Sequence, residues 1–268
     1  MLQLKLMKSL WGMTGALEQQ FSQIAEAGYD GIEADPPLNS AKEFEQLLKK
    51  YNFEYIAQIH TQDDHIASFA EQVKRAASFN PIMIVSHSAK DSMSIENQYV
   101  FFEKALALEK EIGIPIAHET HRGRAMFTPW HTAILLNEFK ELKLTADFSH
   151  WCCVCESLLE NHDKELEIAI ERAIHIHGRI GYSGGPQVPH PLAPEYNLER
   201  KRHEDWWLKI CNQREKTGAS YITFTPEYGP SPDYMHTIPF TNMPVTDLWE
   251  VCRTMGQNFK LLFQEGGR

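Results

Sequence analysis

The sequence lacks the segments that carry a chain into or across a membrane. Its N-terminus, MLQLKLMKSLWGMTG, has neither the uninterrupted apolar core nor the small-residue cleavage site of a signal peptide. No apolar run elsewhere approaches the roughly 18 residues that a transmembrane helix needs. We therefore expect a cytoplasmic protein with no membrane partner.

Positive charge is scarce as well. The chain has 26 Lys and Arg against 36 Asp and Glu, a formal net charge of -10. Proteins that bind nucleic acid need clustered Lys and Arg to contact phosphates, so this balance argues against a nucleic-acid partner.

Cysteine is present but does not form a recognisable framework. The five cysteines are an odd and unevenly spaced set, which argues against disulfides. Cys152 and Cys155 have the C-x-x-C spacing of a redox pair or of half a zinc site, but no second C-x-x-C completes such a site. We interpret the WCCVCE cluster as buried thiols at the start of a helix.

One pattern does recur along the chain: a short apolar run followed by a segment with helical periodicity. The runs are LQLKLMKSLWG, YDGIEADP, FEYIAQIHTQ, PIMIVSHSAKD, IPIAHETHRGR, LKLTADFSHW, RAIHIHGRIG and SYITFTPEYGP. A strand and a helix in roughly every 30 residues is the βα unit of a parallel sheet. Eight units favour a closed (β/α)8 TIM barrel over an open doubly wound sheet, and no G-x-G-x-x-G turn follows the first run.

The pattern also predicts the domain organisation. No linker rich in Pro, Ser or Gly divides the chain, so we expect residues 1–268 to form a single barrel domain. One long irregular stretch, YSGGPQVPHPLAPEYN at about 182–197, follows the seventh expected strand. Because it leaves the end of the barrel where active sites lie, we expect it to be a lid or a substrate-binding loop.

Polar residues stand at the ends of the expected strands, where barrel enzymes place their chemistry. They are His60, His87, Glu119, His121, Asp147, His150, His175, His177 and Glu227. Carboxylate oxygens and imidazole nitrogens are ligands for divalent metals, although a single histidine at a strand end is more often a hydrogen-bonded structural residue. Gathered at one mouth, these groups would repel one another and lose hydration unless a cation or a substrate compensated them. A bound divalent metal is the simplest explanation.

Five segments together carry a resemblance to a known family: GYDGIEAD, HETHRGR, LTADFSH, HIHGRIG and TFTPEYGP. They resemble the sugar phosphate isomerase/epimerase members of the xylose isomerase-like TIM barrel superfamily, which also contains endonuclease IV. The resemblance runs from Lys8 to about Gly229. It implies one divalent metal ion (Mn, Co, Mg or Zn) as the cofactor, held by Glu119, Asp147, His177 and Glu227.

The resemblance also implies an activity. We expect a sugar or sugar-phosphate isomerase or epimerase that transfers a proton through an enediolate, with Glu119 and Glu227 as acid and base. The same first step would serve a polyol dehydratase, and the sequence does not choose among these outcomes. The substrate would be a small-molecule carbohydrate, for which the candidate binding residues are His60, His87, His121, Arg122, His150 and Arg179.

Two histidines of the seventh run need separate roles. His175 and His177 lie two positions apart in an expected strand, so both project from the same face. His177, nearer the strand end, is the better ligand, whereas His175 would orient a ligand or fill the barrel. His118 has the opposite parity to Glu119 and should face the helices.

Other residues have weaker signals. Trp11 and Trp151 could wall the pocket, because aromatic faces pack against sugar C–H groups. Glu33 and Asp35 end the second expected strand, and we assign them at most a polar wall. Many relatives have a Lys-Asp pair after the seventh-strand histidine where this chain has HGRIG, which leaves the substrate open.

Two rival functions remain. A metal-dependent phosphoester hydrolase of the endonuclease IV type would use His60, His87, Glu119, Asp147, His150, His177 and Glu227, but the loop that should supply an Asp-x-His pair has His190 without the aspartate. A two-metal site built from His60, His87 and Glu119 would also suit a hydrolase. The other rival is a metal-stabilised sugar-binding protein without turnover. Apolar helix faces could make a homo-oligomer, although one sequence does not show which faces are exposed.

Overall fold

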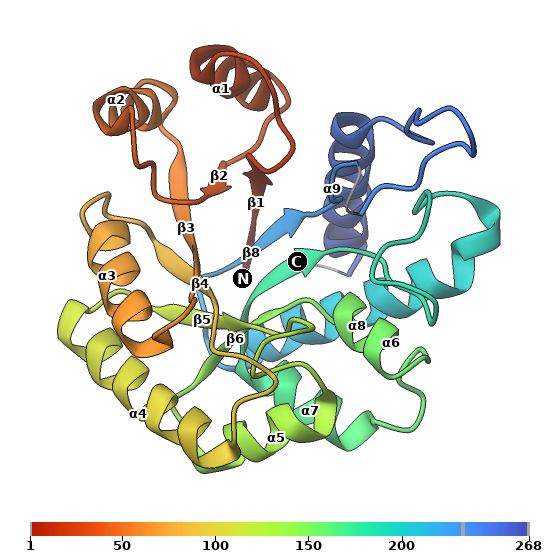
Figure 1. Ribbon diagram of the computed structural model, residues 1–268. Helices are drawn as coiled ribbons and strands as arrows, with labels where there is room; N and C mark the ends of the chain where they lie inside the picture. The colour runs from red at the N-terminus through yellow and green to blue at the C-terminus, as the bar shows by residue number, and fades with distance from the viewer. Residues whose placement is uncertain (1, 232–233, 267–268) are drawn as a thin grey trace.

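Eight parallel strands form a closed barrel inside a layer of helices (Figure 1). The computed structural model describes residues 2–231 and 234–266. The strands follow one another around the barrel in chain order, and β8 pairs with β1. They are β1 (Gln3–Ser9), β2 (Gly31–Ala34), β3 (Glu54–His60), β4 (Met83–His87), β5 (Ile116–Glu119), β6 (Lys143–Ala146), β7 (Ala173–Gly178) and β8 (Tyr221–Pro226). The predicted (β/α)8 TIM barrel is confirmed.

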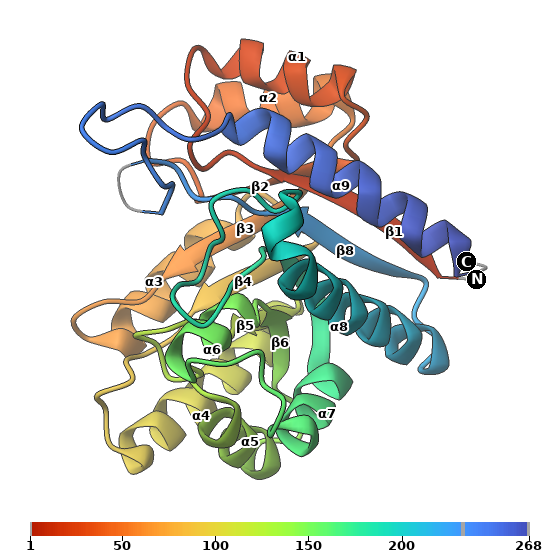
Figure 2. The same cartoon turned by 90° about the vertical axis from the view of Figure 1, so that its right-hand side faces the viewer.

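Helices connect successive strands. They are α1 (Leu17–Glu26), α2 (Ala41–Tyr51), α3 (His65–Ala77), α4 (Ile95–Ile112), α5 (Pro129–Glu138), α6 (Ser149–Val154), α7 (Asp163–Arg172), α8 (Asn197–Lys216) and α9 (Leu248–Glu265). The last of them, α9, packs against β1 and β8 and so completes the outer layer (Figure 2). Within the described residues, no helix combines the length and the apolar character needed to cross a membrane.

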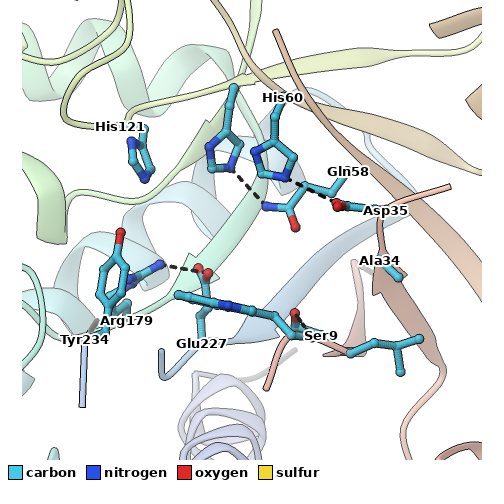
Figure 3. A pocket seen from close by; sticks show the side chains of 12 residues that line it. Ser9, Ala34, Asp35, Gln58, His60, His121, Arg179, Glu227 and Tyr234 are labelled. Atoms are coloured by element: carbon cyan, nitrogen blue, oxygen red, sulfur yellow. Dashed lines mark hydrogen bonds and ion pairs between the residues drawn. The ribbon is translucent and has the colours of Figure 1, made fainter. Parts of the chain in front are cut away.

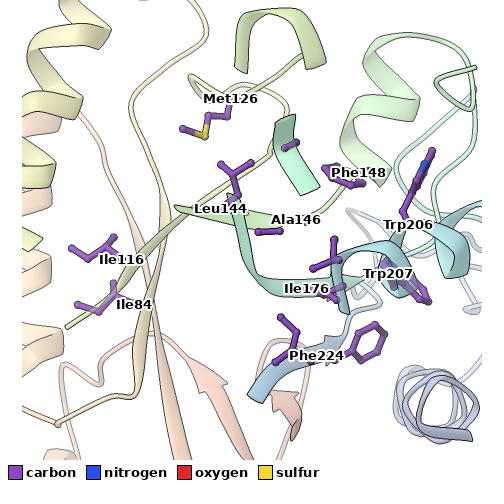
Figure 4. Packing of buried hydrophobic residues seen from close by; sticks show 14 of the residues in the cluster. Ile84, Ile116, Met126, Leu144, Ala146, Phe148, Ile176, Trp206, Trp207 and Phe224 are labelled. Carbon is purple, nitrogen blue, oxygen red and sulfur yellow. The ribbon is translucent and has the colours of Figure 1, made fainter. Parts of the chain in front are cut away.

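Strand alternation separates an outer core from the barrel interior. The outward side chains pack against the helices in the larger apolar cluster, which includes Leu144, Ile176 and Phe224 (Figure 4). A much smaller cluster lies inside the barrel and contains Met7, Ile56, Met83, Val85 and Ala117. Because so few apolar side chains fill the interior, polar residues occupy the part of it near the carboxyl ends of the strands.

The stretch at 182–197 is irregular apart from a short 3-10 helix, η1 (Pro194–Tyr196). It is fastened to the segment after β8. The amide of Gln187 accepts a hydrogen bond from the Gly229 N–H (2.6 Å) and donates one to the Gly229 carbonyl (3.2 Å). The Tyr228 hydroxyl donates to the Pro189 carbonyl (2.6 Å). The two loops therefore support one another.

The cysteines of the WCCVCE cluster are free thiols. Cys152 lies in α6 and is buried, as predicted, but Cys153 and Cys155 are only half-buried. The prediction of buried thiols was therefore wrong for two of the three, because α6 is a short helix at the rim of the barrel.

Candidate metal centre

Four side chains at the strand ends meet inside the barrel mouth. Glu119 is the last residue of β5, His177 lies near the end of β7, and Asp147 and Glu227 directly follow β6 and β8. One ligand atom from each lies within 4.8 Å of the others, and all four residues are buried. The strands are parallel, so their carboxyl ends share one rim, which is why residues far apart in sequence gather there.

His177 is at the centre of this group. Its Nδ1 lies 3.1 Å from Glu227 Oε2 and 3.4 Å from Glu119 Oε1. Asp147 approaches from the side, with its Oδ1 held by hydrogen bonds from the Ser149 N–H (3.1 Å) and from the Ser149 hydroxyl. The second oxygen of Asp147 is thereby left to face the other members.

The donor set fits a divalent metal ion. Asp147 Oδ2, His177 Nδ1 and Glu227 Oε2 are buried, yet none has a hydrogen bond of good geometry to another described residue. Buried polar atoms rarely stay unsatisfied, and an ion bound by three carboxylates and one imidazole would satisfy them together. Oxygen and nitrogen ligands of this kind suit Mn, Co, Mg or Zn alike, so the set does not select among them.

The pKa values in the cluster reflect both burial and the charges of neighbouring acidic and basic groups. Burial, together with the neighbouring Glu227 and Glu119, raises the pKa of Asp147 to about 7, against the opposing charge of Arg179. Although burial works in the other direction, Arg179 and His177 lower the pKa of Glu227 to about 2. In the same way Glu33, Glu227 and Glu119 hold the pKa of His177 above its usual range despite its burial.

Glu33 lies deeper in the barrel than the four candidate ligands and holds one of them, His177, in place. Its carboxylate is 1% exposed, and it contacts His177 Nε2 through Oε1 (2.9 Å) and His175 Nε2 through Oε2 (3.2 Å). The Thr225 hydroxyl donates to Oε2 as well (2.5 Å). A carboxylate on the far nitrogen of an imidazole fixes the orientation of the ring, so Nδ1 of His177 points at the three carboxylates.

His175 lies in the layer below His177, as its position in the strand predicts. Its Nδ1 lies 2.7 Å from the Thr223 hydroxyl, and the side chain is fully buried. Its contacts are with Glu33, Thr223 and Thr225, which suits a supporting residue. His118 faces the helices, where its ring packs against Phe69 and Phe102.

Four predicted substrate-binding histidines form a row along one side of the mouth. Ring centroids are 4.2 Å apart for His60 and His87, 4.6 Å for His87 and His121, and 3.8 Å for His121 and His150. Nε2 of His87 contacts Glu119 and lies 3.0 Å from the Gln58 amide nitrogen. Burial lowers the pKa of His121 to about 3 and also lowers those of His87 and His150. These three are therefore neutral imidazoles near pH 7, able both to donate and to accept hydrogen bonds.

The row does not assemble the second metal site considered from the sequence. His60 Nε2 lies 3.2 Å from Asp35 Oδ1, at the half-exposed outer end of the row. Among the described residues, the donor groups close enough to hold an ion are three sets: Glu119, Asp147, His177 and Glu227; Glu33, His175 and His177; and Glu119, His121 and His150. His60 and His87 belong to none of them.

Arg179 is buried at the centre rather than placed in an open loop. It is 2% exposed, its Nε lies 3.2 Å from Asp147 Oδ2, and its Nη2 lies 2.7 Å from Glu227 Oε1. The guanidinium also lies 5.6 Å from the ring centroid of Trp11 and 4.7 Å from that of Tyr234. Arg122, the other predicted arginine, lies 5.1 Å from the same Tyr234 ring.

A cavity of about 570 Å³ opens onto these groups (Figure 3). It is lined by Ser9, Leu10, Trp11, Ala34, Asp35, Gln58, His60, His87, His121, Arg179, Glu227 and Tyr234. Its size is that of a small-molecule site. Trp11 lines the cavity, but Trp151 does not: it is fully buried and donates from Nε1 to the Met126 carbonyl. The described residues of 182–197 are also absent from this lining.

The sequence interpretation underrated three residues. Glu33 is more than the polar wall expected from the sequence, because alternation in β2 points it away from the side of the outward-facing Ile32 and so into the barrel. Gln58 could have been found by the same rule, since it lies two positions before His60. Tyr234 carries no such signal, because it comes from a loop.

Comparisons with known proteins agree with this architecture. The model of the xylose isomerase-like TIM barrel family matches residues 21–179, more than half of the chain. No curated protein matches the chain. Among solved structures, a probable 3-DHS dehydratase from Bacillus anthracis is similar with a TM-score of 0.61 and 12% identity, covering 96% of this chain and 98% of the other.

Two further structures have comparable similarity. An AP endonuclease of family 2 from Brucella melitensis has a TM-score of 0.60 and 16% identity over 86% of this chain and 94% of its own. A xylose isomerase domain protein from Alicyclobacillus acidocaldarius has a TM-score of 0.61 and 11% identity over 98% and 99%. At such identities the structures establish the fold alone. Together with the family match, they lead to one conclusion: the chain belongs to the xylose isomerase-like TIM barrel family.

Proposed function

We propose that this protein is a divalent-metal-dependent isomerase or epimerase of a sugar or sugar phosphate. The observation that carries the proposal is the position of Glu119 and Glu227. Both are buried carboxylates within 3.4 Å of the same nitrogen of His177, and Glu227 also lines the cavity. Two carboxylates beside one metal position, one of which lines a cavity of substrate size, are the groups that proton transfer at carbon requires.

In the proposed reaction the bound ion would be held by Glu119, Asp147, His177 and Glu227, and it would stabilise the negative charge of an enediolate. One glutamate removes the proton from the carbon next to the carbonyl, and the other returns a proton. Return to the opposite face of the same carbon gives an epimer, and return to the adjacent carbon gives the aldose or ketose isomer. The neutral imidazoles of His87, His121 and His150 would hold substrate hydroxyls.

The experiment is deuterium exchange. Wild-type protein with added Mn, Co, Mg or Zn is incubated in D2O with a panel of ketoses and ketose phosphates, and incorporation is followed by mass spectrometry. We expect exchange by the wild type and at least a hundredfold slower exchange by Glu119→Gln and Glu227→Gln, consistent with the roughly 10²–10⁴-fold contribution of general acid–base groups. Glu109→Gln, a half-buried carboxylate beside the start of β5, serves as the matched control. Equal exchange rates in Glu227→Gln and the wild type would refute the assignment.

A dehydratase of a polyol would share the first step of this reaction. A probable 3-DHS dehydratase has a similar fold, so dehydration is the second candidate reaction. Product analysis separates the two, because dehydration releases water and leaves a product lighter by that mass. A hydrolase of the endonuclease IV type is less well supported, since His60 and His87 do not join a set of donor groups close enough to hold a second ion.

A further inference from the structure

One nitrogen of the Arg179 guanidinium has no partner among the described residues. Its Nε and Nη2 face the carboxylates of Asp147 and Glu227, at 3.2 and 2.7 Å. Nη1 is buried, yet it has no hydrogen-bond partner among the described residues. The residue lines the cavity, and Nη1 lies on the end of the guanidinium that faces neither carboxylate, so an anionic ligand seated against Arg179 would satisfy it. A buried, unpartnered donor of this kind is costly unless a ligand satisfies it.

Aromatic rings hold this group in place. Trp11 and Tyr234 both lie against the guanidinium, and their own rings meet edge to face with centroids 5.2 Å apart. Gly229 backs both rings: a Cβ at that position would come within 2.7 Å of Trp11 and 2.6 Å of Tyr234. Because carboxylates and rings fix the side chain, little further ordering is needed when a ligand binds.

A second arginine lies at the same ring. The Arg122 guanidinium is 5.1 Å from the Tyr234 centroid, and its side-chain hydrogen bond is a weak one to Cys153 Sγ at 3.9 Å. Within the described residues, no carboxylate forms an ion pair with Arg122, although the whole chain has an excess of acidic residues. Two guanidiniums therefore lie against the Tyr234 ring, and because Arg179 and Tyr234 both line the cavity, this part of it is a setting for an anion.

We propose that Arg179, assisted by Arg122, binds an anionic carboxylate of the substrate, so that the substrate is a polyhydroxy acid rather than a neutral sugar. This inference rests on the proposed function and narrows its substrate class. Arg179 touches Asp147 and Glu227 directly, so an anion on its free edge lies beside the reacting carbon. A carboxylate can be bonded to that carbon or to its neighbour. The phosphate of a sugar phosphate is carried on the terminal carbon and would lie further from the metal centre.

The test is binding to metal-loaded protein, measured by titration calorimetry with three matched probes: gluconate, glucitol and glucitol 6-phosphate. We expect gluconate to bind at least about tenfold more tightly than glucitol, since hydrogen bonds between charged groups contribute more than those between neutral ones. Arg179→Gln should bring the ratio of gluconate affinity to glucitol affinity to about one, whatever its effect on both through the metal centre. Arg179→Lys should keep part of the preference because the charge remains but the fork is lost. Arg200→Gln is the control: this half-buried residue of α8 pairs with Glu204 and is not among the residues that line the cavity, so its replacement should leave both affinities unchanged.

The metal content of each variant is measured alongside, so that loss of metal is not mistaken for loss of the anion site. If Arg179→Gln fails to fold, Arg122→Gln still tests the proposal, because that half-buried side chain should contribute severalfold to gluconate affinity and nothing to glucitol affinity. Equal binding of gluconate and glucitol by the wild type would overturn the proposal. So would equal weakening of both by Arg179→Gln, or a preference for glucitol 6-phosphate over gluconate that Arg179→Gln removes.

The outcomes also separate this inference from the proposed function. Selective gluconate binding without deuterium exchange on any keto acid or ketose would leave the anion site standing and refute the isomerase or epimerase. Deuterium exchange on neutral ketoses with the same kcat/KM as on keto acids would support the isomerase or epimerase and refute the anion site.

Discussion

Replacing Glu33 tests the organisation of the metal centre more directly than replacing any ligand, because Glu33 lies beneath the candidate site and not in it. Its buried carboxylate accepts from three partners: His177, His175 and Thr225, at 2.9, 3.2 and 2.5 Å. Glu33→Gln keeps the volume of the side chain but replaces one acceptor oxygen with an NH2 group. At least one of the three buried contacts is then lost, which should lower the free energy of unfolding by about 1–3 kcal/mol.

Metal affinity should fall as well. His177 would no longer be held by a charged acceptor at Nε2, and loss of such a supporting carboxylate typically weakens metal binding by about 10–100-fold. Unfolding in urea measures the first effect, and competition with a chromophoric chelator measures the second.

The control for Glu33→Gln is Glu109→Gln. Glu109 accepts a hydrogen bond from the Ile116 N–H (3.2 Å) and pairs with Lys143, both at the start of their strands and so at the opposite end of the barrel. This variant should lose stability but keep the metal affinity of the wild type. If Glu33→Gln folds and binds metal within about twofold of the wild type, Glu33 does not orient His177 and the reasoning fails.

Three other outcomes follow from the structure. Burial lowers the pKa of His203 to about 4, so below pH 6.5 the unfolded chain binds a proton at this residue and the folded chain does not. The free energy of unfolding should therefore fall by up to about 3 kcal/mol between pH 6.5 and 4. In urea unfolding, His203→Gln should reduce this dependence of stability on pH. Gly31→Ala would place a Cβ 2.2 Å from the Glu54 carbonyl oxygen of the paired strand and should destabilise the barrel by about 1–3 kcal/mol in the same assay. A divalent ion at about 100 times its Kd should raise the free energy of unfolding by about 2.7 kcal/mol, which a thermal scan detects as a higher Tm. If the ion raised the Tm of Asp147→Asn as much as that of the wild type, Asp147 would not be a ligand.

Much of the fold was predictable because it rests on local patterns. Runs of buried strand followed by amphipathic helix appear in the sequence at a regular interval, and the barrel is the structure that buries eight of them. The pattern did not predict that α6 and α7 would both follow β6, since the short α6 has no apolar face long enough to recognise. The thiols of Cys153 and Cys155 were misplaced for the same reason.

The candidate site was predictable only in part. Strand ends of a parallel barrel share one rim, so a list of polar strand-end residues is also a list of neighbours. Contacts across the barrel interior are different. Glu33 on β2 reaches His175 and His177 on β7, and these strands are not adjacent in the sheet, so no local rule joins them. The pairing of Arg179 with Tyr234 depends on a loop conformation that the sequence pattern does not specify.

Arg179 bears on how many ions the centre holds. Buried charges are tolerated when they are compensated, and the carboxylates of Glu119, Asp147 and Glu227 exceed the charge of one divalent ion by one. The guanidinium of Arg179, in contact with two of the three, removes that excess. Glu33 is compensated separately by the donors that surround it. Together with Arg179, the four residues Glu119, Asp147, His177 and Glu227 are therefore matched in charge to one divalent ion.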